Sequence, residues 1–359
     1  MVYKNQELEM DRLLSQVLEH GSSDLHLLVG KPPYLRLDGK LVPVAGYPVC
    51  EAEHLDKLLG VLLNDAQKKQ LDERKQVDFS HSYKGDARFR VNVYYQKGTL
   101  AAAFRHIPTK IRTLSELGLP DKLGDFTKYR QGLVLVVGPT GHGKSTTLAA
   151  LVDMINHTRA EHIITIEDPI EYLFIQDKSI ISQREVYQDT ESFAVAIRAT
   201  LREDPNVVMV GEMRDLESIS TTITVAETGH LVFATLHTND AAQTIDRIVD
   251  VFPSHQQNQV RSQLANILVG VISQRLLPRV GGGQIPALEI MSSNNAVRNV
   301  IREGRSYELP NIIHTSGGEG MISLDKYLAE MVKKGLVKLE DAQPFSNSPD
   351  LFKSLVKRY

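Results

Sequence analysis

The stretch Leu133-Val-Leu-Val-Val-Gly-Pro-Thr-Gly-His-Gly-Lys-Ser145 decides the fold of this chain. Its second part, Gly138–Ser145, matches the phosphate-binding pattern G-x-x-x-x-G-K-[ST]. The apolar run before it predicts a buried strand, and Ser145–Ile155 predicts a helix after it. A strand, a glycine-rich turn and a helix in this order are the context that the pattern requires, so we expect a P-loop.

The chemistry of this pattern is phosphate binding. Glycines let the backbone turn so that several N–H groups point at one centre, where the following helix adds a partial positive charge. We expect Lys144 to reach the β- and γ-phosphates and the Ser145 hydroxyl to bind Mg²⁺. A glycine-rich turn that matches by chance is the alternative, and the flanking strand and helix disfavour it. The residues predicted to contact ATP are Gly138, Pro139, Thr140, Gly141, His142, Gly143, Lys144, Ser145 and Thr146.

Two acidic clusters follow strand-like runs, where a P-loop needs an acid near the metal and a group that positions water. In Val207-Val-Met-Val-Gly-Glu212 an apolar run ends in an acid, and Glu212 is expected to hold Mg²⁺, partly through water. In Ile166-Glu-Asp-Pro-Ile-Glu171, Glu171 or Glu167 could polarise the attacking water. The alternative for each acid is an ordinary strand-end residue that caps a helix or faces solvent.

Two histidines flank one apolar run in Thr228-Gly-His-Leu-Val-Phe-Ala-Thr-Leu-His-Thr238. A lone histidine is usually a structural hydrogen-bonding group. Beside a P-loop, however, His230 and His237 could instead sense the γ-phosphate or orient water.

The rest of the chain divides into two domains. Apolar runs separated by helical stretches predict a mainly parallel sheet covered on both faces for residues 132–359, with a mostly helical region from about residue 254. Residues 1–112 predict a small α+β domain. Residues 113–131, which have mixed polarity and contain prolines and glycines, are expected to form the linker.

Two arginines are expected to face each other in the first domain. Strand patterns at Arg88–Tyr95 and Thr99–Ile107 flank Lys97-Gly98. If Lys97-Gly98 is a two-residue hairpin loop, Arg90 lies directly opposite Arg105. Opposed like charges are destabilising, so an anion or an acidic partner is expected there. A solvated basic face is the alternative, and a three-residue loop would shift the pairing by one residue.

Composition narrows the class of protein further. The 359 residues carry 41 Lys and Arg and 44 Asp and Glu, a net charge of −3, so no global charge favours nucleic-acid binding. Residues 1–112 hold 17 basic and 14 acidic residues, which leaves 24 and 30 for residues 113–359. The single cysteine, Cys50, excludes an intrachain disulfide and a multi-cysteine zinc site. No apolar run approaches the length of a membrane span, and the N-terminus lacks the pattern of a signal peptide, so we expect a cytoplasmic protein.

Together these motifs resemble those of the secretion-type motor ATPases, and among them the type IV pilus retraction ATPases. Ser23-Asp-Leu-His26 is similar to the family's N-terminal signature, and Gly138–Ser145 to its Walker A motif. Ile166–Glu171 resembles its Asp box, Val210–Asp215 its Walker B motif and Ala226–Thr238 its His box. The resemblance covers nearly the whole chain.

The resemblance implies a PAS-like N-terminal domain, followed by a RecA-like P-loop ATPase domain. It implies a homohexamer that hydrolyses ATP with Mg²⁺ to power pilus retraction, as in twitching motility. Force would reach pilin indirectly, through an integral inner-membrane platform protein on whose cytoplasmic face the motor acts. The first domain would present arginines to a neighbouring subunit's nucleotide. The site residues implied are Glu171 as catalytic glutamate, Glu212 as Walker B acid, His230 and His237 as the His-box pair, and Arg90 and Arg105 as the arginines.

Other functions remain open at this point. Pilus assembly and type II secretion ATPases are similar, but they are usually longer and carry a cysteine-rich zinc motif, whereas Ala296–Glu303 resembles a segment of retraction motors. A retraction paralogue is also possible. A RecA-like nucleic-acid motor would need a basic channel with stacking aromatics, and the chain has no tryptophan and an acidic second half. A nucleotide sensor that does not hydrolyse ATP would not need two acids after strands.

Overall fold

The computed structural model describes residues 2–37, 39–84 and 87–357, and the side chains of the first helix from Gln6 onward. The chain forms two compact units. One is Met1–Lys110 with Glu171–Leu173, and the other is Ile111–Ile170 with Phe174–Tyr359. No helix in the described part of the chain is both long and apolar enough to cross a membrane.

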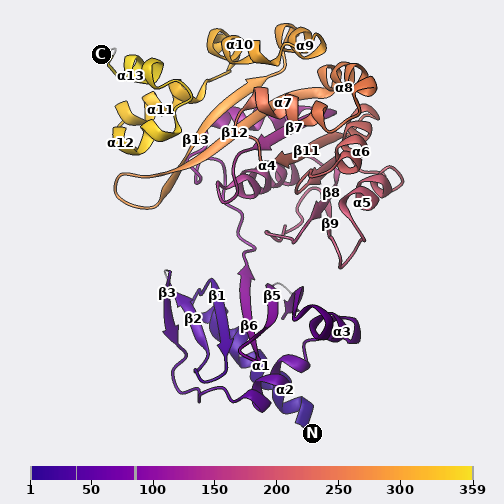
Figure 1. Ribbon diagram of the computed structural model, residues 1–359, viewed down its shortest axis with the longest axis vertical. Coiled ribbons are helices and arrows are strands. Elements are labelled where there is room, and N and C mark those ends of the chain that lie inside the picture. The colour runs from indigo at the N-terminus through magenta and orange to yellow at the C-terminus, as the bar shows by residue number, and fades with distance from the viewer. Residues whose placement is uncertain (1, 38, 85–86, 358–359) are drawn as a thin grey trace. The chain divides into compact units, whose positions relative to one another are not determined.

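The first unit is built on an antiparallel sheet with helices on one face (Figure 1). The strand order is β3-β2-β1-β6-β5-β4. Alternate residues of the strands, such as Leu25, Phe89 and Phe104, are buried with Leu13 and Leu14 of the first helix. The elements are α1 Val2–Glu19, β1 Asp24–Leu28, β2 Tyr34–Leu37, β3 Lys40–Pro43, α2 Ala52–Gly60, α3 Asp65–Arg74, β4 Gln76–Tyr83, β5 Ala87–Gln96 and β6 Thr99–Ile107.

The β5–β6 hairpin has the predicted register. Lys97 and Gly98 both have positive φ, 49° and 79°, which is the geometry of a two-residue type I′ turn. Arg90 therefore pairs with Arg105 across the two strands. The prediction that these arginines lie directly opposite each other is confirmed.

The second unit is built on a seven-stranded sheet in the order β13-β12-β7-β11-β10-β8-β9 (Figure 1). All neighbouring strands are parallel except the β12–β13 pair, so β13 forms an antiparallel edge. The apolar runs at residues 133–137, 163–166, 207–210 and 231–234 all form strands, as expected for a mainly parallel sheet. The observed bounds are β7 Gly132–Val137, β8 His162–Glu167, β9 Ile180–Glu185, β10 Val207–Val210, β11 Leu231–Leu236, β12 Leu268–Pro278 and β13 Gln284–Ser292.

Helices cover both faces of this sheet, as expected for a parallel sheet with two buried faces. Along β7, Leu133 and Leu135 pack on one face with α5 to α10, whereas Val134 and Val136 pack on the other with α4. The helices are α4 Lys144–Thr158, α5 Phe193–Thr200, α6 Leu216–Glu227, α7 Ala241–Asp250, α8 Ser254–Ile267, α9 Asn295–Arg302, α10 Leu309–Thr315, α11 Leu324–Lys333, α12 Leu339–Ala342 and α13 Pro349–Lys357. The 3₁₀ helices are η1 Asp121–Lys128, η2 Ser306–Glu308, η3 Gly317–Glu319 and η4 Gln343–Phe345.

The prediction of a linker at residues 113–131 is wrong. Leu114, Leu123 and Phe126 are buried in the core of the second unit, and Phe126 lies against the backbone of Gly270. A Cβ on Gly270 would come within 2.4 Å of the Phe126 ring. Leucines and phenylalanines spaced among polar residues therefore dock this segment on the sheet, despite its prolines and glycines.

The prediction of a mostly helical region from about residue 254 is wrong for residues 268–292. There the chain forms β12 and β13, the longest strands of the sheet, and β12 pairs with β7. Sequence reasoning missed them because polar residues, Ser273 to Arg275, interrupt the apolar run of β12. Their side chains donate hydrogen bonds to neighbouring loops instead of packing in the core.

Candidate active site

The P-loop lies between the end of β7 and the start of α4, at the carboxyl edge of the sheet. Gly138 has a φ of 147°, and a Cβ there would lie 2.4 Å from the carbonyl oxygen of Gln274. Only glycine fits this approach of the loop to β12. Lys144 begins α4, and its Nζ donates hydrogen bonds to the carbonyl oxygens of Gly138 and Pro139 at 2.8 and 3.0 Å. The loop thus curls around the lysine ammonium, as a phosphate cradle requires.

His237 joins the P-loop to the acid predicted on the neighbouring strand. It follows β11, and its Nδ1 lies 3.3 Å from both Lys144 Nζ and Thr140 Oγ1. Its Nε2 lies 2.9 Å from Glu212 Oε1. An Nε2–H that donates to the carboxylate leaves Nδ1 as the acceptor facing the lysine. The structure therefore brings Lys144, His237 and Glu212 into one connected group.

Glu212 lies two residues after β10, where neighbouring side chains donate to both of its oxygens. Oε1 faces His237, and Arg214 Nη2 donates to Oε2 at 2.8 Å. Burial by itself would raise the pKa of Glu212, but the hydrogen bonds from Arg214 and His237 outweigh it and lower the pKa below its usual value. The carboxylate is therefore ionised at neutral pH. Arg214 was not predicted from the sequence, although it lies only two residues from the predicted acid.

The donor groups of the residues predicted to bind the metal are of the kind that P-loop proteins use for Mg²⁺. Mg²⁺ commonly takes one or two protein ligands, substrate phosphates and several waters. Ser145, the second residue of α4, would supply the hydroxyl ligand. Glu212 has both oxygens engaged by Arg214 and His237, so contact through water suits it better than direct ligation. No cluster of three or more His, Cys, Asp or Glu that could hold a metal by itself exists in the residues the structure describes.

The two glutamates of the 166–171 segment have different settings. Glu167 is buried at the end of β8, where Thr165 and Gln183 donate to its Oε1 at 2.7 and 3.3 Å. A Cβ on Gly211, the residue before Glu212, would touch Glu167, so Glu167 lies beside the Walker B strand. Glu171 is exposed and belongs with Glu171–Leu173 to the first unit, in which the N–H of Leu173 donates to Pro108. The second unit by itself therefore contains Glu167 and lacks Glu171.

His230 does not join His237. It precedes β11, whereas His237 follows it, and this six-residue strand separates them by roughly 20 Å at 3.3 Å per residue. The Nδ1 of His230 lies 3.0 Å from Val225 O and 3.2 Å from Thr228 Oγ1, contacts that fix the turn between α6 and β11. The structure therefore does not bring His230 to the P-loop of its own chain, because a strand places its two ends at opposite edges of the sheet.

Strand β12 supplies contacts that the sequence analysis missed. Gln274 Nε2 donates to the carbonyl oxygen of His142 at 2.8 Å, and Thr147 Oγ1 donates to Gln274 Oε1 at 2.7 Å. The backbone N–H of Leu276 donates to His142 Nδ1 at 2.9 Å, so a neutral His142 carries its proton on Nε2. Burial, followed by the charges of Arg275 and Lys144, lowers the pKa of His142 and favours that neutral form. No local pattern marked these contacts, because Ser273 to Arg275 interrupt an apolar run that continues at Leu276 and Leu277.

The arginine pair of the first unit is neutralised by two acids that the sequence analysis did not assign. Arg105 Nε donates to Asp24 Oδ1 at 2.9 Å, and Arg90 Nε lies 3.9 Å from Asp78 Oδ1. Asp24 is buried and also lies 3.7 Å from Arg36. Burial alone would raise the pKa of Asp24, but hydrogen bonds from Ser23 and Arg105 lower it. The expected acidic partner is therefore Asp24, which lies in the Ser23–His26 motif.

Comparison with known proteins gives consistent results. The family model described as Type II/IV secretion system protein matches residues 5–305. A Pseudomonas aeruginosa type IV pilus retraction ATPase, PilT, is 46% identical over 345 residues, 96% of this chain and 100% of that protein. The type IV pilus ATPase PilU of Pseudomonas aeruginosa is 37% identical over 351 residues, 98% of this chain and 92% of that protein. The crystal structure of the pilus retraction motor PilT with bound ADP superposes with a TM-score of 0.88 at 48% identity, covering 96% of this chain and 98% of that one.

Proposed function

The chain belongs to the Type II/IV secretion system protein family, and from this premise we propose that it is an ATP-hydrolysing motor that powers retraction of the type IV pilus. One observation carries the proposal. The P-loop lysine, Lys144, contacts His237, and His237 contacts the Walker B acid Glu212. The higher identity to PilT than to PilU, 46% against 37%, favours a retraction motor over that paralogue.

Each residue of this group has a part in hydrolysis. Lys144 balances charge on the β- and γ-phosphates, and the P-loop N–H groups bind their oxygens. His237 faces the P-loop with Nδ1, so it contacts the end of the triphosphate and reports its loss to Glu212. Glu171 orients the attacking water, with Glu167 as the alternative. Ser145, and Glu212 through water, would hold Mg²⁺, and the bound ion would neutralise charge on the phosphates.

The arginines of the first unit complete the site in a neighbouring subunit. We assign Arg90 and Arg105, on a PAS-like domain, to the triphosphate bound by the RecA-like domain of the next chain in a homohexamer. Directly opposed arginines are costly unless anions balance them, and Asp24 and Asp78 lie beside them in this structure. A triphosphate that approaches Arg105 competes with Asp24 for the guanidinium. Nucleotide state then changes how neighbouring subunits contact each other, which is what a motor requires.

Mixed oligomers test this assignment. Lys144→Ala lacks a working P-loop, and Arg90→Ala with Arg105→Ala lacks the arginines, so we expect each to be inactive by itself. If arginines act between subunits, mixing the two after subunit exchange restores hydrolysis, because an intact P-loop then meets intact arginines of its neighbour. Arg74→Ala, an exposed arginine at the end of α3, is the matched control and should retain full activity. Equal inactivity of the mixture and its components would contradict action between subunits.

The cellular part of the proposal concerns partners and location. We propose a motor on the cytoplasmic face of the inner membrane that engages an integral platform protein and moves pilin indirectly. Expression in a Pseudomonas aeruginosa strain without its retraction ATPase should restore twitching, and the Lys144→Ala chain should not. Restored pilus assembly in a strain without its assembly ATPase would instead support the assembly or secretion alternative.

A nucleic-acid motor remains the alternative from another class. It predicts that single-stranded DNA or RNA stimulates ATP hydrolysis several-fold, since strand contact completes the sites of such motors. We expect no stimulation, because the second half of the chain has 24 basic and 30 acidic residues.

A further inference from the structure

Strand β12 lies beside β7 and contacts the two loops that carry Lys144 and His237. On one side the Gln274 side chain binds the P-loop at His142 and α4 at Thr147. The close approach of Gly138 to Gln274 O holds the start of the P-loop against the same strand. One short segment of β12 therefore sets where the phosphate cradle lies.

The same segment also binds the loop after β11. Arg275 is buried, and its Nη2 donates to Asn239 O at 2.8 Å and to Asn239 Oδ1 at 3.0 Å. Ser273 Oγ donates to Asn239 O at 2.6 Å. Asn239 lies two residues after His237, the residue that faces Lys144. The guanidinium thus fixes the loop that presents the histidine.

Burial of this arginine is costly, which indicates that its contacts matter. Among the described residues, no ion pair within 4 Å reaches the Arg275 guanidinium, although the charges of Asp240 and Glu289 act on it. A buried cation without a direct ionic partner destabilises a protein unless hydrogen bonds offset the loss of water. The bonds present here are to the two Asn239 oxygens and, from Nη1, to Gln274 O at 3.1 Å. A planar guanidinium can bond Asn239 and the Gln274 carbonyl at the same time, in a way that a lysine ammonium cannot.

We propose that Arg275 is a positioning residue for ATP hydrolysis, which acts by holding the His237 loop in register with the P-loop through β12. The inference rests on the role proposed above for His237. It assigns a function to a residue that none of the predicted motifs contains and that lies in a region where the sequence predicted helices. The 3.3 Å separation of Lys144 Nζ and His237 Nδ1 is the distance that this contact maintains.

The test is a double-mutant cycle in the full-length protein, with kcat and KM for ATP as readouts. Arg275→Gln should lower kcat about 10- to 100-fold, because loss of precise orientation costs rate more than affinity, and should change KM less than about 3-fold. In the His237→Ala background the same substitution should lower kcat less than about 2-fold further, since the group that Arg275 positions is already gone. Arg275→Lys should recover only part of the loss, because it keeps the charge but not the planar fork.

Two further variants guard against a general folding defect. Asn239→Ala removes one acceptor from an exposed residue and should lower kcat about 3- to 10-fold with the melting temperature unchanged. Arg279→Gln, in the exposed part of the β12–β13 hairpin, is the matched control and should have the activity of the unmodified protein. If Arg275→Gln does not fold, the cycle between Asn239→Ala and His237→Ala decides.

The outcomes separate this inference from the proposed function. If His237→Ala lowers kcat and adding Arg275→Gln then lowers it by the same factor as in the unmodified protein, the two effects are independent. This result would overturn the positioning role and leave the proposed function intact. Unchanged kcat in both Arg275→Gln and Asn239→Ala would do the same. Full turnover by His237→Ala would contradict the proposed role of the histidine, and with it the inference.

Discussion

The two edges of the sheet in the second unit both gather charged side chains, but in different ways. At the carboxyl edge, Lys144, His237 and Glu212 form an open chain of contacts around a glycine-rich loop. At the amino edge, Glu161 is buried and accepts from Arg159 Nε at 3.0 Å and from Arg130 Nη1 at 2.5 Å.

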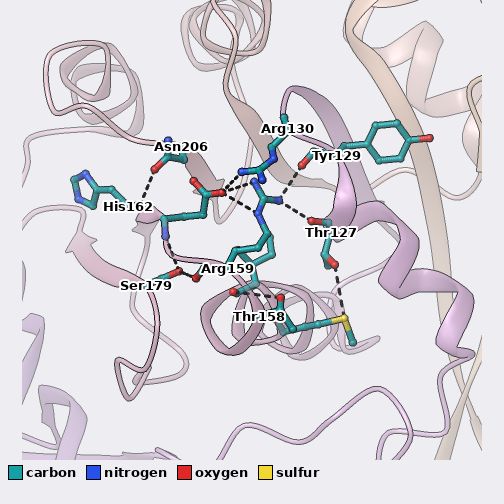
Figure 2. Close-up of polar contacts among 11 residues, drawn as sticks. Thr127, Tyr129, Arg130, Thr158, Arg159, His162, Ser179 and Asn206 are labelled. Atoms are coloured by element: carbon teal, nitrogen blue, oxygen red, sulfur yellow. Dashed lines mark hydrogen bonds and ion pairs between the residues drawn. The ribbon is translucent and has the colours of Figure 1, made fainter.

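Figure 2 shows that the residues of the amino-edge cluster form hydrogen bonds and ion pairs with one another. Arg159 Nη1 donates to the carbonyl oxygens of Thr127 and Tyr129 at 2.7 and 2.9 Å, and Ser179 Oγ donates to Arg159 O at 2.7 Å. These bonds tie η1, α4 and the start of β8 together. The comparison teaches that charge alone does not mark a site. Charged groups that satisfy one another stabilise the fold, whereas groups beside a loop of N–H donors at the carboxyl edge are placed for a ligand.

The largest expected effect is at the carboxyl edge. Lys144→Ala should lower kcat for ATP hydrolysis at least about 1,000-fold, equivalent to about 4 kcal/mol, because the cation that balances phosphate charge is lost. Steady-state phosphate release measures it. Lys178→Ala, an exposed lysine elsewhere in the same unit, is the control and should keep full rate. Full turnover by Lys144→Ala would refute the site.

The two histidines that flank β11 sharpen the comparison, since they lie at opposite edges. His237→Ala should lower kcat about 100-fold through loss of its contacts to Lys144 and Glu212, whereas His230→Ala should change kcat less than about 3-fold. Single-turnover rates of both variants measure the difference. Equal losses would show that the strand does not separate their functions.

The amino edge should respond in stability instead of rate. Glu161→Gln leaves the mostly buried Arg159 without its acid and should lower the free energy of unfolding by about 3 kcal/mol, with kcat of the folded protein within about 2-fold. Urea unfolding measures it. Glu217→Gln, which removes an exposed ion pair with Arg198, is the matched control and should cost less than about 1 kcal/mol. A loss of kcat in folded Glu161→Gln would contradict the claim that the amino edge affects stability and not catalysis.

The smallest effect is expected at the buried acid Glu289, where it should appear only as a dependence of stability on pH. Burial raises the pKa of Glu289 to about 7, despite the hydrogen bond from the Ala241 N–H. Because this pKa in the folded chain lies above the usual value of 4.5, the stabilisation present below pH 4.5 is lost as the pH rises towards about 7. Glu289→Gln should therefore remove part of the fall in melting temperature between pH 5 and about 7.5. Parallel profiles for the two proteins would contradict this.

The sequence anticipated the features that are local. The P-loop follows from one pattern and its flanking strand and helix, and the register of Arg90 with Arg105 follows from the length of one turn. Glu212 was found because an acid after a buried parallel strand reaches the carboxyl edge. Each inference needed only residues close together in the chain.

The errors concern segments whose partners are distant in sequence. Residues 113–131 have the composition of a linker, and the docking of Phe126 on Gly270 depends on a residue 144 positions later. Likewise, β12 pairs with β7 across more than a hundred residues, so its polar residues gave no local sign of their contacts with the P-loop.

The sequence by itself thus determined that this chain has a phosphate-binding loop with acids and histidines after its buried strands, because strand period and turn chemistry are set by neighbours in the chain. Only the tertiary structure decided which of these groups meet. It placed His237 against Lys144, left His230 at the opposite edge, paired Arg105 with Asp24 and brought Arg275 to Asn239. The physical reason is that hydrogen bonds and burial between distant segments depend on which strands are neighbours in the sheet. The spatial order of the strands is set by packing of the whole core.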